Sequence, residues 1–258
     1  MKRATIVVAL LILALVPSIL RACGHFTNYD VVRAGTPRFD GVYPPGTFVL
    51  KETTARELVR MLEATVHALG AIDVRYFLAA GSLLGWARHQ KSIIPFDDDI
   101  DLYMFSPVTT KQLARLGTLL PSDMRLIFFQ GWWKVVSTRI CLTDRLSISI
   151  DLFEVEEVEG RRIQLKNPVA LRKWPKETYP HDIVFPLRTD VFCGVNVHLP
   201  NDPGAMLRHQ YGADCMTIGY INNVHGPAAY LASHLCLQGK PVKKMTMTAA
   251  RCVPLLNE

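Results

Sequence analysis

The stretch that decides the fold is Phe77–Phe105, FLAAGSLLGWARHQKSIIPFDDDIDLYMF. It contains a Gly-Ser pair, Gly81 and Ser82, and then four aspartates among isoleucine, leucine and phenylalanine: Asp97, Asp98, Asp99 and Asp101. Acidic clusters usually lie in solvated loops, whereas these apolar neighbours are typical of a buried strand. The segment therefore predicts carboxylates that a rigid apolar backing holds close together.

Strand alternation divides this acidic cluster. Side chains at i, i+2 and i+4 of a strand share a face, so Asp97, Asp99 and Asp101 point one way and Ile100 points to the core. Asp98 has the opposite parity and is expected to cap the loop. Three carboxylates on one face repel unless a cation lies between them, and Mg²⁺ or Mn²⁺ prefers oxygen ligands. The spacing predicts a divalent cation site; a calcium loop or a solvated acidic turn is the alternative, although an EF-hand lacks its glycine here.

Two further elements extend the predicted site. Gly81-Ser82 is expected where a strand ends and a helix begins, and backbone N–H groups there can hold a phosphate, although an ordinary N-cap is the alternative. Asp151, in SISIDLFEV, is expected to supply a third carboxylate, because a lone aspartate inside an apolar strand is costly unless it is paired or metal-bound. Glu154 and Glu156 fit a solvated strand face. The combination predicts phosphoryl or nucleotidyl transfer.

Hydrophobic periodicity predicts an α+β domain, with a mostly antiparallel or mixed sheet flanked by helices. A helix is expected over 54–70, with Thr54 and Glu57 at capping-box spacing. The part after Lys166 is rich in proline and reads as loops, with a weak helical signal at 228–237. The other expected elements are a strand at 74–80, a helix from Gly81, a strand at 99–105, a helix at 109–120, and a meander of strands at 124–130, 132–142 and 145–158.

The N-terminus has the layout of a targeting segment. Lys2 and Arg3 precede an uncharged apolar run, Ala4–Leu20. This pattern predicts a signal peptide or, by a narrow margin, an uncleaved signal anchor, with the rest of the chain in the lumen of the secretory pathway at the ER or Golgi membrane. The expected organisation is an anchor or signal peptide (1–21), an irregular stem (22–51), the main domain (52–216) and a C-terminal extension (217–258).

Composition limits the classes of protein. A chain of 258 residues, 49% hydrophobic, is long enough for one well-packed domain. The net charge of +6 is spread along the chain, so no nucleic-acid partner is expected. None of the six cysteines forms a C-x-x-C pair, so a zinc knuckle is not indicated. The cysteines could form one or two disulfides, or remain free as buried thiols, and the sequence leaves both alternatives open.

The segment GSLLGWARHQKSIIPFDDDIDLYM resembles the signature of the LicD/fukutin family within the nucleotidyltransferase superfamily. The resemblance continues at ISIDLFEVE and at VFPLRTDVFCGVNVHLPNDPGAMLRHQYG, and covers roughly residues 54–216. The cysteine-rich zinc insertion that some members carry is not apparent. The resemblance implies a nucleotidyltransferase-like fold for the main domain.

The resemblance also implies a reaction: a phospho-alcohol group, phosphocholine or an alditol phosphate, passes from a CDP-activated donor to a glycan hydroxyl, and CMP leaves. Carried over to this chain, Asp99 and Asp101 bind Mg²⁺ (or Mn²⁺), Asp151 is a third ligand or the base, and Asp97 is an alternate ligand.

Cationic groups are expected to neutralise the transferring phosphate, and Arg88 and Lys134 are the candidates. His89 is expected at the surface, and Trp132 or Trp133 in the core. Two other functions stay open: a nucleotidyltransferase of another kind, for example one that acts on a nucleic-acid end, and a non-catalytic relative that assists glycosylation. The retained aspartates and the apolar N-terminus favour the lumenal phosphotransferase.

Overall fold

The computed structural model describes residues 28–32, 42–44, 47–129, 131–139, 148–222 and 242–251. The expected anchor or signal peptide (1–21), most of the stem and the helical signal at 228–237 lie outside these residues. Among the helices that the structure describes, none combines the length and apolar character needed to cross a bilayer. Of the six cysteines, Cys193 and Cys215 are described, and both are free thiols.

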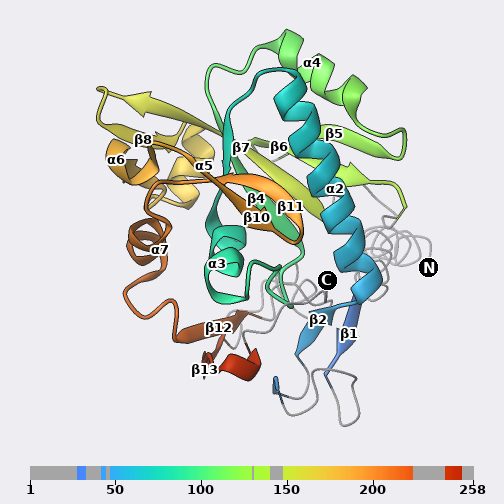
Figure 1. Ribbon diagram of the computed structural model, residues 1–258, viewed down its shortest axis with the longest axis vertical. Helices are drawn as coiled ribbons and strands as arrows, with labels where there is room; N and C mark the ends of the chain where they lie inside the picture. The colour runs from blue at the N-terminus through green and yellow to red at the C-terminus, as the bar shows by residue number, and fades with distance from the viewer. Residues whose placement is uncertain are drawn as a thin grey trace, which may run out of the picture.

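A seven-stranded mixed sheet forms the centre of the molecule (Figure 1). The strand order is β3-β4-β7-β6-β5, with β8 beside β7 and β9 beside β8. The β4–β7 pairing is parallel, and the other pairings within this sheet are antiparallel. The predicted α+β class with a mixed sheet is therefore confirmed. The strands are β3 (Tyr76–Leu78), β4 (Asp99–Phe105), β5 (Met124–Phe129), β6 (Trp132–Ser137), β7 (Ser149–Val158), β8 (Arg162–Leu165) and β9 (Thr178–Pro180).

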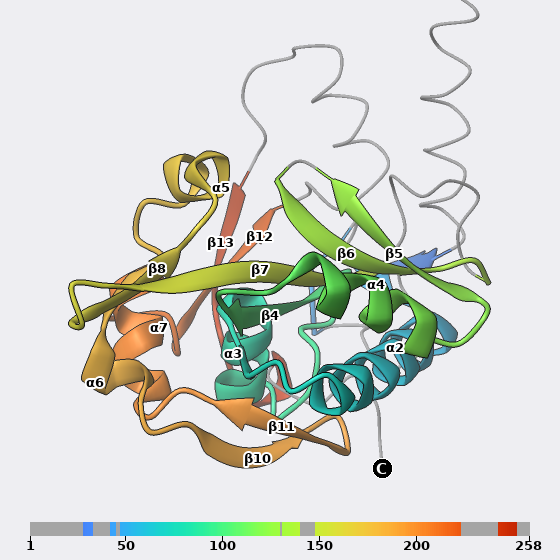
Figure 2. The same cartoon turned by 90° about the horizontal axis from the view of Figure 1, so that it is seen from above.

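Helices and a hairpin cover the sheet. In Figure 2, α2 and the hairpin of β10 (Arg188–Phe192) and β11 (Val195–Leu199) lie on one side of the sheet, and α5 lies on the other. The helix α2 buries an apolar stripe that includes Leu58, Met61 and Leu62, which explains its length and position. The helices are α2 (Glu52–Ala71), α3 (Ala80–Arg88), α4 (Thr110–Leu119), α5 (Pro168–Lys173), α6 (His181–Val184) and α7 (Pro203–Tyr211).

The predicted start of α2 was wrong. Thr54 and Glu57 lie inside the helix, which begins at Glu52, and the N-cap residue Lys51 forms no side-chain cap. Both residues are buried and pack inside the fold rather than cap the helix. Glu57 accepts a hydrogen bond from the Ser137 hydroxyl. A capping box does occur at α4, between Thr109 and Gln112.

The part after Lys166 is more ordered than its proline content suggested. Pro168 and Pro203 stand in the first turns of α5 and α7, where a missing N–H is harmless, and Asn167 and Asp202 cap these helices. The hairpins and the short 3₁₀ segment are β1 (Tyr29–Val31) with β2 (Phe48–Leu50), β10 (Arg188–Phe192) with β11 (Val195–Leu199), β12 (Ile218–Asn222) with β13 (Val242–Thr246), and η2 (Ala249–Arg251).

The alternation of β4 separates core from site. Ile100, Leu102 and Met104 are fully buried, whereas Asp99 and Asp101 are half-buried at the other face. The parallel register places Asp101 directly opposite Asp151 of β7. The sheet thus brings together two carboxylates that are far apart in the sequence.

Candidate active site

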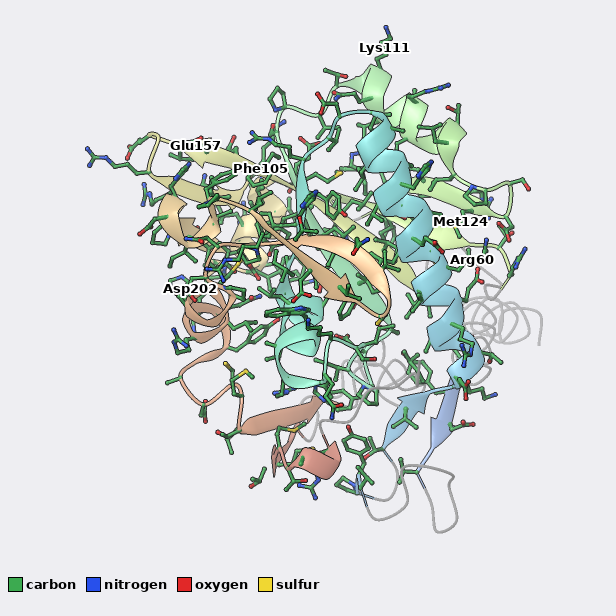
Figure 3. The ribbon with its side chains drawn as sticks, viewed as in Figure 1. Arg60, Phe105, Lys111, Met124, Glu157 and Asp202 are labelled. Carbon is green, nitrogen blue, oxygen red and sulfur yellow. The ribbon has the colours of Figure 1, made fainter. Side chains whose placement is uncertain are left out.

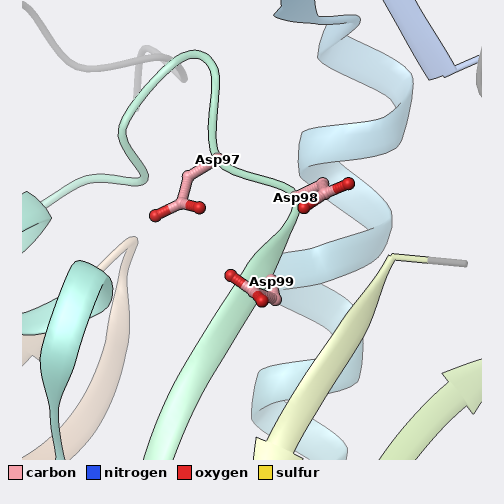
Figure 4. Close-up of side chains that lie close together, drawn as sticks. All are labelled: Asp97, Asp98 and Asp99. Carbon is pink, nitrogen blue, oxygen red and sulfur yellow. The ribbon is translucent and has the colours of Figure 1, made fainter. Parts of the chain in front are cut away.

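The aspartates converge at the beginning of β4 and the adjoining part of β7. One carboxylate oxygen each of Asp99, Asp101 and Asp151 lies within 4.8 Å of the others, as predicted for a metal site. Asp97 and Asp98 belong to the loop that leads into β4, and their carboxylates also reach within 4.8 Å of that of Asp99. The oxygens of Asp97 and Asp98 lie within 4.8 Å of each other as well, and Figure 4 shows both residues on the loop just before Asp99. Burial, followed by the Asp98 charge, raises the pKa of the Tyr29 hydroxyl.

The fold does not neutralise the acids of β4. Among the described residues, no lysine, arginine or histidine forms an ion pair with Asp99 or Asp101. Burial, followed by the charges of Asp101 and Asp97, raises the pKa of Asp99 well above its ordinary value. Burial and then the charge of Asp151 do the same for Asp101. Carboxylates in this position favour a bound cation, and the oxygen donors fit a divalent ion such as Mg²⁺.

Asp151 has a different environment. Its side chain is 3% exposed, and the Lys134 ammonium lies 2.7 Å from each carboxylate oxygen. The Trp132 indole N–H donates to Oδ2 at 2.8 Å, and the Ser149 hydroxyl donates to Oδ1 at 2.6 Å. Burial lowers the pKa of Lys134, but the charges of Asp151 and Asp99 outweigh it and raise that pKa overall. The fold therefore supplies one cation and two further donors to this single aspartate.

The Gly-Ser pair lies against the acids. The helix α3 begins at Ala80, one residue before the expected start. The Ser82 hydroxyl is buried and accepts the backbone N–H of Asp101 at 2.9 Å, so it fixes the position of β4. A Cβ at Gly81 would lie 2.6 Å from Oδ2 of Asp97. A side chain at position 81 would therefore displace the Asp97 carboxylate from the first turn of α3.

Arg88 and His89 close the other end of α3. Arg88 is buried and donates from Nη1 to the backbone carbonyls of Cys215 at 2.7 Å and Ile218 at 3.1 Å. It lines the cavity beside the acids, but these bonds tie α3 to the chain after α7. His89 was expected at the surface, and that expectation was wrong because its side chain is fully buried. Burial and the Arg88 charge lower the pKa of His89 to about 3.

A cavity of about 630 Å³ opens above the acids. Asp97, Asp99 and Asp101 lie along it, and the segment that follows α5 supplies another part of its wall. That segment was not anticipated as part of the site, because its prolines indicated a loop. The signal that could have marked it is KWPKE, two lysines and a glutamate around a tryptophan. The wall residues from this segment are Lys173, Trp174, Pro175, Lys176 and Glu177.

Glu177 is the buried carboxylate of this wall, with 3% exposure. It accepts hydrogen bonds from the Tyr179 hydroxyl and from Nε2 of Gln210. Burial raises the pKa of Glu177 above its ordinary value, and hydrogen bonds from Tyr103 and Tyr179 offset only part of that effect. This network gives the cavity a rigid polar side.

Aromatic rings support the acids from below. Trp132 is 6% exposed and stacks on Phe153, with ring centroids 5.0 Å apart and planes at 27°. Trp174 meets Trp132 edge-on at 5.3 Å. The expectation that Trp132 lies in the core is confirmed, and its indole N–H also orients Asp151. Trp133 is half-buried and packs against Phe128.

Comparison with known proteins shows that part of the chain matches the sequence model of one protein family. The sequence model described as "LicD/FKTN/FKRP, nucleotidyltransferase domain" matches residues 73–202, about half of the chain, and this range includes all of the predicted site residues. An uncharacterized protein of Rickettsia prowazekii (strain Madrid E) is 27% identical over 159 residues, which cover 61% of this chain and 54% of that protein.

Two further similar proteins are named for an activity. The "Ribitol 5-phosphate transferase FKRP" of Homo sapiens is 30% identical over 197 residues, which cover 74% of this chain and 36% of that protein. The protein of the same name from Mus musculus is 29% identical over 215 residues, which cover 80% of this chain and 39% of that protein. The chain thus spans about half or less of the length of the curated relatives that it matches.

Proposed function

The chain belongs to the LicD/FKTN/FKRP nucleotidyltransferase family, and from that premise we propose that it transfers a phospho-alcohol group from a CDP-activated donor to a glycan hydroxyl. The observation that carries this proposal is the convergence of Asp99, Asp101 and Asp151 beside a cavity of about 630 Å³. The mammalian relatives are named for ribitol 5-phosphate transfer, which supports an alditol phosphate as the transferred group, with phosphocholine as the other candidate.

In the proposed reaction the acceptor hydroxyl oxygen attacks the phosphorus that carries the alcohol. A new P–O bond forms, the bond to the CMP oxygen breaks, and CMP leaves with the bonding electron pair. The acceptor proton passes to a carboxylate of the site, and we assign this role to Asp151. Lys134, Trp132 and Ser149 hold that carboxylate in one orientation.

Asp99 and Asp101 are the proposed ligands of Mg²⁺ or Mn²⁺, with Asp151 or Asp97 completing the set. When bound, the ion would neutralise charge on the donor diphosphate and on the leaving CMP. Ser82 and Gly81 set the position of these ligands, because one bonds the backbone of Asp101 and the other admits the carboxylate of Asp97. In this proposal they position the carboxylates, in addition to any contact that the α3 N-terminus makes with phosphate.

The setting of the reaction is also part of the proposal. A glycan acceptor and the apolar N-terminal run fit an enzyme of the secretory pathway, held at the ER or Golgi membrane by that run. A nucleotidyltransferase that acts on a nucleic-acid end, and a non-catalytic protein that assists glycosylation, are the alternatives. The scattered positive charge speaks against the first, and the unneutralised acids speak against the second.

A donor screen tests the proposal. The purified full-length chain is incubated with CDP-ribitol, CDP-glycerol, CDP-choline or ATP and with glycan acceptors, and nucleotide release is followed with and without EDTA. We expect CMP release from one CDP donor, dependent on an acceptor and abolished by EDTA. The matched control is Asp101→Asn, which should release none. Nucleotide release that occurs only with ATP and an oligonucleotide acceptor would refute the proposal. Calorimetry that detects binding of neither nucleotides nor Mg²⁺ would also refute it.

A further inference from the structure

The cationic side chains around the cavity differ in what they contact. Lys134 is fully engaged by Asp151 and Ser149, and Arg88 donates to backbone carbonyls. These two were the residues expected from the sequence to neutralise a phosphate. Both make contacts within the fold, and the end of α5 and the segment after it supply two further cations to the cavity, the exposed side chains of Lys173 and Lys176.

Lys173 is the better placed of the two. It is the last residue of α5, and its ammonium lies 4.2 Å from the ring centroid of Trp174 and 5.2 Å from that of Trp132. Aromatic faces attract a cation and limit where it can lie, but they do not neutralise it. No carboxylate of the described residues lies within ion-pair distance of Lys173. Its charge is therefore localised and available to the cavity.

We propose that Lys173 binds the phosphate groups of the donor in the cavity that it lines together with Asp99 and Asp101. The proposal rests on the phosphotransfer function proposed above and names the residue that holds the charged part of its substrate. An anionic diphosphate cannot approach a floor of aspartates unless cations offset the repulsion, and lysine binds phosphate as a point charge.

The surroundings of Lys173 support this role. Burial of its stem and then the charge of Lys134 lower the pKa of Lys173, while Asp151 and Asp99 offset only part of that effect. The negative charge of a bound phosphate would favour the protonated form of Lys173 and so oppose this lowering of its pKa. The ammonium is also connected to the acids by a chain of contacts, since Trp132 touches Lys173 through its ring and Asp151 through its N–H. Trp132 therefore links the cation to one carboxylate of the site.

The competing explanation is that Lys173 only packs on the tryptophan rings. Lys173→Met separates the two explanations, because methionine keeps an apolar stem over the rings and removes the charge. Lys173→Arg restores the charge. The matched control is Lys111→Met, which makes the same change at an exposed lysine of α4, far from the cavity (Figure 3).

The experiment measures binding of inorganic pyrophosphate and of CDP to the full-length chain by calorimetry in Mg²⁺, together with the KM and kcat for the CDP donor. We expect Lys173→Met to weaken the binding of both probes about tenfold and to raise KM more than it lowers kcat. Lys173→Arg should stay within about threefold of the parent, and Lys111→Met should equal it. Thermal unfolding should be unchanged in all three variants.

Pyrophosphate binding that is equally tight in the parent and in Lys173→Met would overturn the assignment, and so would a parent chain that binds neither probe. The outcome distinguishes the two proposals. If pyrophosphate binding depends on Lys173 but no CDP donor is turned over, the anion site stands and the transferase function fails. If CMP is released with equal KM by the parent and by Lys173→Met, the function stands and Lys173 has no part in it.

Discussion

Two acidic clusters lie on this fold, and only one of them is balanced by the fold. Glu57 and Asp123 share Arg60 of α2, whose Nη2 lies 2.5 Å from the first carboxylate and 2.9 Å from the second. Asp99 and Asp101, on β4, have no such partner among the described residues.

The opposite pKa shifts express this difference. Although burial raises it, hydrogen bonds from Arg60 and Ser137 hold the pKa of Glu57 below its ordinary value, whereas the pKa of Asp99 is raised. A carboxylate that the fold neutralises adds to stability, and one that it leaves unbalanced reduces stability until a ligand arrives. The comparison teaches that the balance of charge, rather than the number of acids, marks the site.

Replacing the unbalanced acids should give the largest effect. Asp101→Asn and Asp99→Asn should each lower the rate of CMP release about a thousandfold, roughly 4 kcal/mol in transition-state free energy, because each removes a proposed metal ligand. Neither should lower the free energy of unfolding, since each relieves repulsion between like charges. Rates are compared by CMP release and stabilities by urea titration. A variant that keeps most of its activity would show that its aspartate binds no essential cation.

Breaking the balanced pair inside the site should come next. Lys134→Met leaves the buried Asp151 without its cation, and we expect a loss of about 3 kcal/mol in the free energy of unfolding. Urea titration measures it. The double variant Lys134→Met, Asp151→Leu should recover part of that stability while staying inactive, because it no longer contains a buried unpaired charge. Equal stability of the parent and the single variant would mean that the pair contributes little.

The cluster on α2 should affect stability alone. Glu57→Gln is expected to cost about 2 kcal/mol in the free energy of unfolding at pH 7 and to leave CMP release unchanged, because the cluster lies away from the cavity. A loss of activity larger than the loss of folded protein would contradict the division between the two clusters.

The same cluster predicts a pH dependence. The pKa of Glu57 is lower in the folded state, so its ionised form stabilises the fold. This contribution to the free energy of unfolding is fully present above the pKa of an unfolded glutamate, about 4.3. It is lost as the pH falls through the lower folded value. The free energy of unfolding, measured by urea titration at a series of acidic pH values, should therefore fall less steeply with acidification in Glu57→Gln than in the parent chain.

The smallest effect should follow from loosening β4 without changing its charge. Ser82→Ala removes the hydroxyl that accepts the backbone N–H of Asp101, and we expect a loss of about 1 kcal/mol in stability. The rate of CMP release should fall only severalfold, because the carboxylates remain. Ser82→Thr, which keeps a hydroxyl, is the control. A loss as large as that of Asp101→Asn would assign Ser82 a direct role in substrate binding.

The alternation of apolar and polar residues predicted the strands that carry the acids. This was possible because the side chains of a strand point alternately to its two faces, a pattern that can be read from neighbouring residues alone. The bounds of β4 coincide with the DIDLYMF run, and Asp151 lies on the expected strand. The partner of each strand was not predictable in this way. The parallel pairing of Asp101 with Asp151 and the antiparallel pairing of Lys134 with Asp151 are long-range choices of register.

The wall of the cavity was also missed. Lys173 and Glu177 lie in a proline-rich stretch without periodicity, so nothing local marks them as neighbours of β4. Arg88 lines the cavity, but its bonds to backbone carbonyls follow from the packing of the chain after α7, which the sequence pattern does not indicate. Sequence patterns indicate which residue types are present, whereas tertiary contacts determine what each side chain is free to bind.

The parallel pairing of β4 with β7 has a consequence for how the protein matures. The two strands are separated in the chain by α4, β5 and β6, so their pairing closes a long loop, and contacts of this kind form slowly. The β5–β6 hairpin can form from neighbouring residues, but the set of carboxylates exists only after β7 has docked beside β4. A divalent ion would thus stabilise the finished fold and none of its partly folded precursors, so the supply of metal would act on the yield of mature protein as well as on its turnover.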